Sequence, residues 1–214
     1  MTRIEIFADL SCPWCYIAER RLDLALAHRP GRAVEKVWRP FVLHPNLPPE
    51  GIAWPEYVDS TWGGVEQAGP MFERLRTMGE VEGIQFDWKR VRTAPNTVDA
   101  HRLILYAERR GREWPLADAL FRAYFAEGRD LNDRDTLTEI AAGESLDPVD
   151  VRALLEGTSG AAEVEASRRT ATELGVEAVP FFVFDGTVAV SGAQPVELFL
   201  EVLDRCELQD APVS

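Results

Sequence analysis

The stretch Asp9-Leu10-Ser11-Cys12-Pro13-Trp14-Cys15-Tyr16-Ile17-Ala18 decides how this chain of 214 residues folds. It carries two of the three cysteines and follows an apolar–polar alternation over residues 4–9 that is typical of a strand. After it, apolar residues recur at helical spacing: Ala18, Leu22, Ala25 and Leu26. Cys12 is therefore expected at the N-terminal edge of a helix. Pro13 suits the first turn, where its missing N–H leaves no bond unmade.

This position predicts a reactive thiol at Cys12. Unpaired N–H groups and the positive end of the helix dipole favour an anion at a helix start. Thiols in such Cys-X-X-Cys sites are more acidic than free cysteine, so we expect Cys12 to attack disulfides at neutral pH. Cys15 comes one turn later and is expected to resolve the mixed disulfide, leaving a Cys12–Cys15 bond.

Three other interpretations of the cysteine pair compete with redox chemistry. A zinc site needs about four ligands at characteristic spacings, but there is no second Cys-X-X-Cys and the three histidines are scattered. We therefore expect no metal. A structural disulfide would close too short a loop to stabilise much. Two unrelated core cysteines remain an alternative, although both would stand at one strand-to-helix junction.

Composition limits the class of protein. The 46% hydrophobic content suffices for a core, and the length fits one domain with an insertion or two small domains. The net charge of −13 argues against nucleic acid or an anionic membrane as partner. No apolar run is long enough to span a bilayer, and no export signal precedes the first strand. Together with the few cysteines, this predicts a cytoplasmic protein.

The segment after the first helix combines a strand and a long loop. Residues 34–43 are predicted to form a strand that Pro40 moves to a sheet edge or ends early. Residues 44–64 are rich in Pro and Gly and are predicted to be a loop without long regular elements. Long loops in compact domains are often functional. Three aromatic residues on it either pack or line a substrate groove: Trp54, Tyr57 and Trp62.

Residues 66–171 are predicted to form a block of helices. Helical spacing with cap signals indicates successive helices after Asn96 or Thr97, after Asp133 and after Asp147. The last helix of this part is expected to end at Gly175.

The C-terminal part returns to strands. The apolar run over 181–184 suits a buried strand, and Asp185-Gly186 is a two-residue hairpin signal before 188–190. A closing helix is predicted from Pro195. Cys206 falls on its apolar face, which favours a buried, inert thiol over a redox role.

Four sequence runs together resemble DsbA-like thiol oxidoreductases, and within them the FrnE-type branch. They are Asp-Leu-Ser-Cys-Pro-Trp-Cys-Tyr-Ile at 9–17, Pro-Asn-Thr at 95–97 with Ala-His-Arg-Leu at 100–103, Gly-Val-Glu-Ala-Val-Pro-Phe-Phe-Val-Phe at 175–184, and Ser-Gly-Ala-Gln-Pro at 191–195. The resemblance covers nearly the whole chain. It implies an α/β thioredoxin fold interrupted by an all-helical insertion domain. The expected parts are residues 1–65 and 172–214 of the thioredoxin-like domain and residues 66–171 of the insertion.

The resemblance also implies roles for site residues. Cys12 is the nucleophile, Cys15 the resolving thiol, and no cofactor is required beyond a redox-active Cys12–Cys15 disulfide. Pro180 is implied to be cis, which would aim the Val179 backbone at the substrate. The substrate is a protein or small-molecule thiol or disulfide. The residues expected to contact it are Pro13, Trp14, Val179 and Pro180, with Asn96, His101, Ser191 and Gln194 as weaker candidates.

Two departures and two rival functions accompany this resemblance. Pro13-Trp14 replaces the Pro-His of DsbA, so a strongly oxidising potential is not carried over, and Cys206 stands without the second cysteine pair of some FrnE-type proteins. One rival is a 2-hydroxychromene-2-carboxylate isomerase or kappa-type glutathione transferase, which typically has serine in place of Cys12 and binds glutathione. Ser191 and Gln194, just before a helix, could then hold a peptide carboxylate. The other rival is a non-catalytic, redox-sensitive binding module.

Overall fold

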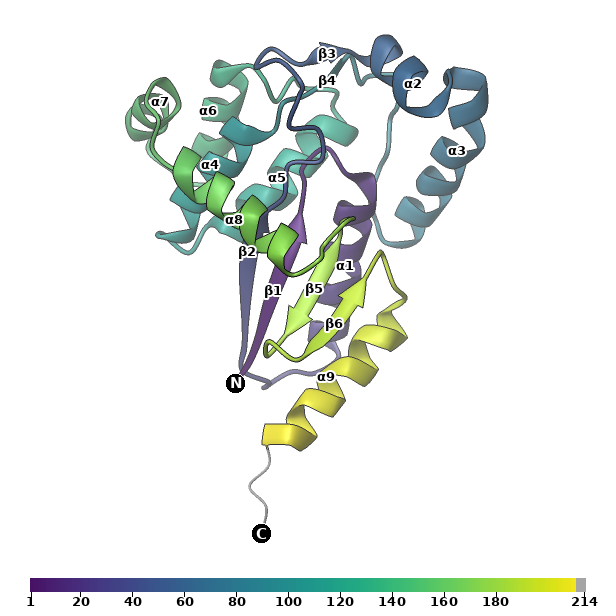
Figure 1. The fold of residues 1–214 in the computed structure, drawn as a ribbon, viewed down its shortest axis with the longest axis vertical. Helices are drawn as coiled ribbons and strands as arrows, with labels where there is room; N and C mark the ends of the chain where they lie inside the picture. Colours follow the sequence, from purple (N-terminus) through teal and green to yellow (C-terminus); the bar gives the residue numbers. More distant parts are fainter. Residues whose placement is uncertain (211–214) are drawn as a thin grey trace.

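A four-stranded sheet forms the base of the molecule in the computed structural model, which describes residues 1–210 (Figure 1). The strand order is β2-β1-β5-β6. β1 pairs in parallel with β2 and antiparallel with β5, and β5 pairs antiparallel with β6. The bounds are Thr2–Ala8 for β1, Val34–Pro40 for β2, Phe181–Phe184 for β5 and Val188–Ser191 for β6. As predicted, the second strand lies at a sheet edge and ends at Pro40.

Both faces of the sheet are covered. Helices α1 (Pro13–Ala27) and α9 (Val196–Asp210) pack together against one face, where Ile4 and Ile6 are buried. On the other face Phe7 belongs to a small separate cluster with Ala171 of helix α8 (Ala161–Glu173). Because β1 is buried on both sides, the turn at its C-terminal end starts from a rigid support. That turn carries Cys12.

The helical part stands between β2 and β5 in the chain and fills the upper half of Figure 1. Its helices are α2 (Trp54–Trp62), α3 (Val65–Val81), α4 (Val98–Glu108), α5 (Glu113–Phe125), α6 (Arg134–Gly143), α7 (Pro148–Glu156) and α8 (Ala161–Glu173). Two of the predicted caps are confirmed, because the Asp133 and Asp147 carboxylates each accept two backbone N–H groups at the start of their helices. Thr97 precedes α4 without a cap hydrogen bond from its side chain. Gly175 follows α8 with a positive φ of 69°, as a C-terminal glycine should.

The prediction of a loop without long regular elements over 44–64 is wrong for its second half. This segment contains β3 (Ile52–Ala53) and all of α2. Pro55 falls in the first turn of α2, where proline is tolerated, and Gly63 ends the helix in the left-handed conformation. β3 pairs with β4 (Thr93–Ala94), so the insertion is helical apart from one two-residue strand.

Across the described residues, the helices are all too short or too polar to cross a membrane.

The predicted hairpin between β5 and β6 is confirmed, but its loop has three residues and not two. Phe184 pairs with Val188, so Asp185, Gly186 and Thr187 connect the strands. Asp185 and Gly186 both have positive φ, and the Thr187 N–H donates to the Phe184 carbonyl at 3.0 Å.

Candidate active site

Cys12 sits at the junction of β1 and α1, as the sequence predicts. The Cys12 N–H donates to the Asp9 carbonyl at 3.1 Å, which closes the turn, and the Cys12 carbonyl accepts the Cys15 N–H at 3.1 Å, which opens the helix. Pro13 is the first helical residue. Cys12 and Cys15 are both free thiols and are only 4% and 2% exposed. The two sulfur atoms therefore belong to one rigid helix start.

The segment before β5 approaches Cys12 from the opposite side. The Val179–Pro180 peptide bond is cis, as the resemblance implies. The Cys12 Sγ lies 3.8 Å from the Val179 carbonyl oxygen. Pro180 is itself buried, and its carbonyl accepts the Gly192 N–H at 2.8 Å, which fixes this segment against the start of the last helix. The structure thus brings together residues that are 167 positions apart in the chain.

Cys15 is held as a neutral thiol. Burial raises the pKa of Cys15 well above its ordinary value, and the neighbouring Cys12 sulfur raises it further. The two cysteines therefore differ in their surroundings. Cys12 lines a cavity, whereas Cys15 is not among the described residues that line it.

Asp9 is a functional residue that the sequence reasoning did not single out. Its fully buried carboxylate accepts the Ser11 N–H at 3.1 Å and the Leu43 N–H at 2.6 Å. Burial alone would raise the pKa of Asp9, but the facing His101 and these two N–H groups outweigh it and lower the pKa below its ordinary value. Asp9 therefore fixes the Cys12 turn to the loop after β2. The available signal was a charged residue directly after an apolar strand.

His101 lies behind Asp9 and not at the substrate surface. The ring, on α4, is completely buried, and its Nε2 lies 3.6 Å from Asp9 Oδ1. The indole N–H of Trp38 donates to His101 Nδ1 at 3.2 Å. Since Nδ1 is an acceptor, the ring proton is on Nε2 and faces the carboxylate. Trp38, His101 and Asp9 thus form a buried chain from β2 through the helical insertion to the Cys12 turn.

Asn96 also has a structural environment. Its side-chain amide donates to the Leu47 carbonyl at 2.8 Å, and its side-chain oxygen accepts the Val98 N–H at 3.2 Å. Its backbone N–H donates to Asn132. These bonds fasten the loop before β3 to the start of α4. Like His101, Asn96 is absent from the described residues that line the pocket beside Cys12.

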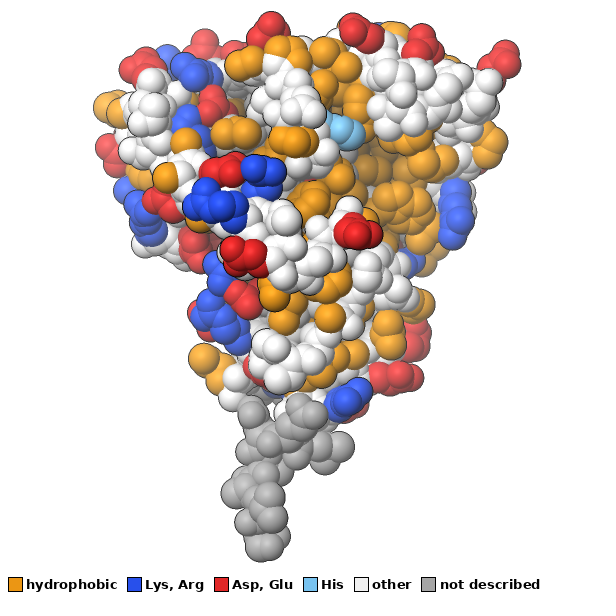
Figure 2. Space-filling view, viewed as in Figure 1, with side chains coloured by type: hydrophobic (Ala, Val, Ile, Leu, Met, Phe, Trp, Pro, Cys, Tyr) orange, Lys and Arg blue, Asp and Glu red, His pale blue; other side chains and the backbone are white. Residues whose placement is uncertain are grey.

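A cavity of about 260 Å³ opens beside Cys12, and we call it the aromatic pocket. Cys12, Pro13, Trp14 and Val179 form the side next to the thiol. Most of its other lining residues are aromatic, and four of the six tryptophans of the chain are among them. The lining rings are Trp14, Trp54, Tyr57, Trp62, Phe72, Trp88 and Phe125. Figure 2 shows the corresponding hollow of hydrophobic side chains below α2 and α3. Trp54, Tyr57 and Trp62 thus do both things that the sequence left open, because they pack against one another and also line a pocket. Contact with a substrate stays a prediction.

The polar side chains of the pocket are uncharged at neutral pH, apart from one at its rim. The Tyr57 hydroxyl and His44 Nε2 are 2.6 Å apart and share a hydrogen bond. Burial lowers the pKa of His44 although the Asp9 charge opposes it, and burial raises the pKa of Tyr57 to about 12. Glu177, an exposed residue before Val179, is the exception.

Ser191 and Gln194 lie beside Pro180 but outside the aromatic pocket. The Gln194 side chain donates to the Ser191 carbonyl at 2.7 Å, within its own turn. The Arg21 guanidinium donates to the Ala193 carbonyl at 2.9 Å and thereby holds the same turn against α1. A carboxylate-binding role for Ser191 and Gln194 stays a prediction.

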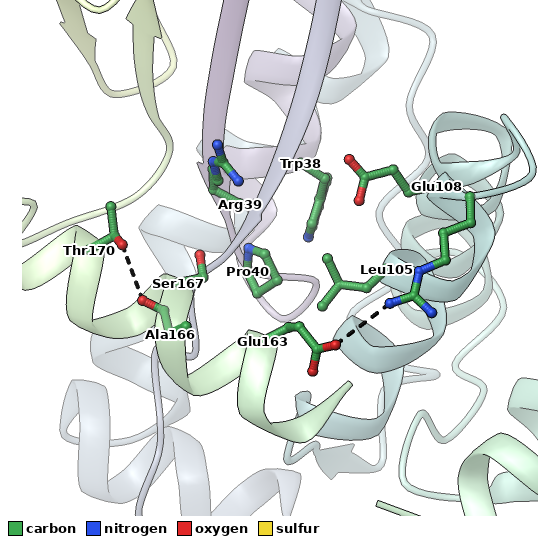
Figure 3. Close-up of a pocket in the computed structure, with 10 residues that line it drawn as sticks. Trp38, Arg39, Pro40, Leu105, Glu108, Glu163, Ala166, Ser167 and Thr170 are labelled. Atoms are coloured by element: carbon green, nitrogen blue, oxygen red, sulfur yellow. Dashed lines mark hydrogen bonds and ion pairs between the residues drawn. The ribbon is translucent and has the colours of Figure 1, made fainter. Parts of the chain in front are cut away.

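A second cavity, of about 390 Å³, lies between β2, α4 and α8 (Figure 3). It contains no thiol among its described lining residues, and two of its charged groups face each other, with Arg109 and Glu163 3.6 Å apart. Arg39, at its edge, is paired with Glu5. Within the described residues no group of three or more His, Cys, Asp or Glu is placed to hold a metal ion. The cavity at Cys12 is therefore the candidate active site.

Comparisons with known proteins agree with this geometry. A family model described as DSBA-like thioredoxin domain matches residues 3–204. The crystal structure of a probable DsbA oxidoreductase from Streptomyces coelicolor has a TM-score of 0.91 and 37% identity, and the match covers 100% of this chain and 93% of that one. The uncharacterized protein YwbO from Bacillus subtilis is 26% identical over 201 residues, 92% of each chain.

Two more distant structures share the fold alone. One is the cytosolic disulfide reductase DsbM from Pseudomonas aeruginosa, with a TM-score of 0.66, 20% identity and coverage of 98% and 100% of the two chains. The other is a 2-hydroxychromene-2-carboxylate isomerase, with a TM-score of 0.70, 17% identity and coverage of 99% of both chains.

Proposed function

The chain belongs to the family of DSBA-like thioredoxin domains, and from this premise we propose that it is a thiol-disulfide oxidoreductase whose redox pair is Cys12 and Cys15. One observation carries the proposal. Two free thiols stand one turn apart at a helix start, and the outer one faces the Val179 carbonyl at 3.8 Å and lines a pocket. A site with one activated group would not need the second, buried thiol.

The reaction proceeds in two exchanges. The Cys12 sulfur attacks a substrate disulfide, so that a Cys12–substrate bond forms, the substrate S–S bond breaks, and one substrate sulfur leaves as a thiol. Cys15 then attacks the Cys12 sulfur, passing its proton to the second substrate thiol as the mixed disulfide breaks. The substrate gains two electrons and two protons, and the enzyme is left with a Cys12–Cys15 disulfide. Run in reverse, the same steps oxidise a substrate dithiol.

Each part of the site has a task in this scheme. Cys12 stands directly before the first residue of α1, where the positive end of the helix dipole lies, and this position supports its role as the attacking group. The neutral Cys15 thiol stays protonated until the mixed disulfide gives it a target. Asp9 holds the turn that carries Cys12. Within this proposal Pro13, Trp14 and Val179 contact the substrate, because they surround Cys12 in the pocket wall.

Finer assignments belong to the same proposal. A place in the FrnE-type branch is supported by the sequence runs around Cys12 and Pro180. Action in the cytoplasm is supported by the use of cysteine, since Cys206 is buried in apolar packing and the other two thiols form the redox pair. Glutathione as a bound cofactor is the rival possibility, and it goes with an isomerase or transferase activity.

The experiment that tests the proposal uses Cys15→Ser in a Cys206→Ala background, so that Cys12 is the one remaining thiol. Mixed with a reporter disulfide, this protein should accumulate an adduct on Cys12, visible by intact-mass spectrometry, while multiple turnover stops. Cys12→Ser in the same background is the matched control and should form no adduct. Sustained turnover without Cys15, or glutathione-dependent isomerisation of an aromatic substrate, would favour the isomerase. If neither the wild type nor any variant turns over disulfides, the result would favour the non-catalytic binding module.

A further inference from the structure

We propose that the aromatic pocket binds an uncharged aromatic side chain adjoining the substrate cysteine, so that the enzyme acts on peptide and protein disulfides flanked by such residues in preference to glutathione disulfide. This inference rests on the proposed oxidoreductase function and names the class of its substrate. Three features of the pocket carry it: the arrangement of its rings, its position and size, and its charge.

The rings of the pocket form a slot with a flat floor and an upright wall. Trp54 is stacked nearly parallel to Trp88, with ring centroids 6.1 Å apart, and lies 5.9 Å from Phe72 at an angle of 28°. Trp62 stands perpendicular to Phe72, at 5.4 Å and 90°, and nearly so to Tyr57, at 5.1 Å and 83°. A guest ring can therefore stack on the floor and meet the wall edge to face. Both arrangements are favoured between aromatic groups.

The position and size of the pocket match one side chain next to the reacting sulfur. Cys12, Trp14 and Val179 belong to the same wall, so a group inside the pocket is attached close to the sulfur that Cys12 attacks. The volume of about 260 Å³ is below the usual range of about 300 to 1,000 Å³ for pockets that enclose a drug-sized ligand. It suits a single large side chain whose backbone stays outside.

The charge of the pocket opposes an anionic guest. Among the described residues that line it, none is Lys or Arg, and the one carboxylate is that of Glu177. The Arg74 guanidinium lies 5.8 Å from the centroid of the Trp14 ring, but Arg74 is not among the described residues that line the pocket. Glutathione carries two carboxylates, which would lose water here without gaining a cationic partner. An uncharged aromatic group loses no such hydration.

The test compares four disulfide substrates with the full-length enzyme. Three are otherwise identical peptides in which the residue next to the disulfide-bonded cysteine is Trp, Ser or Glu, and the fourth is oxidised glutathione. We expect kcat/KM for the Trp peptide to exceed that for the Ser peptide by roughly 10- to 100-fold, the range for burying one large apolar side chain. The Glu peptide and oxidised glutathione should be the poorest substrates.

Variants connect this preference to the pocket. Trp62→Ala removes the upright wall, so the ratio of kcat/KM for the Trp peptide to that for the Ser peptide should fall close to one. Trp62→Phe keeps a ring at this position and should retain most of the preference. Tyr106→Ala, which removes an aromatic ring of α4 outside the pocket, is the matched control and should keep the wild-type ratio. Melting temperatures of all three variants confirm that they are folded.

The outcomes separate this inference from the proposed function. Equal kcat/KM for the three peptides, or faster exchange with the Glu peptide or oxidised glutathione, would overturn the substrate class while leaving the oxidoreductase in place. A preference for Trp that survives Trp62→Ala would also overturn the role of the pocket. Exchange with none of the four disulfides would overturn both proposals together.

Discussion

The buried contact between Trp38 and His101 makes a quantitative prediction about stability. His101→Leu leaves the Trp38 indole N–H without its acceptor and removes the Nε2–H that faces Asp9. Trp38→Phe leaves His101 Nδ1 without its donor. Both residues are at most 1% exposed, so water cannot replace either partner without a change of structure. The double variant removes donor and acceptor together and leaves neither of them orphaned.

The magnitudes follow from the cost of orphaned buried groups. One such group costs about 1 to 3 kcal/mol, whereas removing both partners of a hydrogen bond can be nearly neutral for that bond. We expect His101→Leu to lower the free energy of unfolding by about 1 to 3 kcal/mol, because the buried Trp38 N–H is left without its acceptor. Trp38→Phe should lower it by about 1 to 3 kcal/mol. The loss of unfolding free energy in the double variant should then be smaller than the sum of the two single losses by about 1 to 3 kcal/mol.

Urea unfolding of the wild type, the two single variants and the double variant measures the coupling between Trp38 and His101. It does so provided that the slope of unfolding free energy against urea concentration is the same in all four. His28→Leu combined with Trp38→Phe is the control pair. His28 is exposed and bonds to a backbone carbonyl of its own helix, so its effect should add to that of Trp38→Phe. If the Trp38 and His101 losses also add within about 0.5 kcal/mol, the hydrogen bond contributes nothing and the tautomer assigned to His101 has no support.

Two further predictions concern groups outside the pocket. Burial raises the pKa of Glu19 from 4.5 to about 7 against the attraction of Lys36, so the folded protein holds a proton that the unfolded chain releases. Stability should therefore fall as pH rises from about 4.5 to about 7. Relative to wild type, the free energy of unfolding of Glu19→Gln should rise by up to about 3 kcal/mol across that pH range. Urea unfolding at several pH values measures this difference. Free energies that change with pH in the same way for both proteins would contradict the prediction. Cys206→Ala should leave disulfide exchange rates unchanged and lower the free energy of unfolding by about 1 kcal/mol, and a loss of turnover in a folded variant would instead make Cys206 a relay thiol.

The features that the sequence predicted correctly depend on local signals. The Cys12 turn, the early end of β2 at Pro40 and the hairpin at Asp185-Gly186 are each determined within a few residues by proline, glycine or a cap. In these cases the preferred backbone conformation of the residue types is also the one that the tertiary structure requires. The antiparallel hairpin and the cap residues Asp133 and Asp147 could therefore be placed without any knowledge of distant contacts.

The features that were missed depend on where a residue falls within an element or on distant partners. The prolines and glycines of residues 44–64 were expected to exclude long regular elements, but Pro55 stands in the first turn of α2 and Gly63 directly after its last residue. The same residues thus delimit a helix. Asp9 and His101 are far apart in the chain, and only the packing of α4 behind the Cys12 turn brings them together. No local pattern indicates that His101 faces a carboxylate and not the substrate.

The central claim, that Cys12 and Cys15 form one redox couple, is tested most directly by equilibrating the wild-type protein in a series of glutathione redox buffers. Acid quenching, alkylation and intact-mass spectrometry then count the free thiols in each species. The account predicts two species that interconvert as a two-electron couple: one with all thiols free, and one with a Cys12–Cys15 disulfide and a free Cys206. An oxidised state that consists mainly of a glutathione adduct on Cys12 with Cys15 still free, or of a disulfide to Cys206, would contradict it.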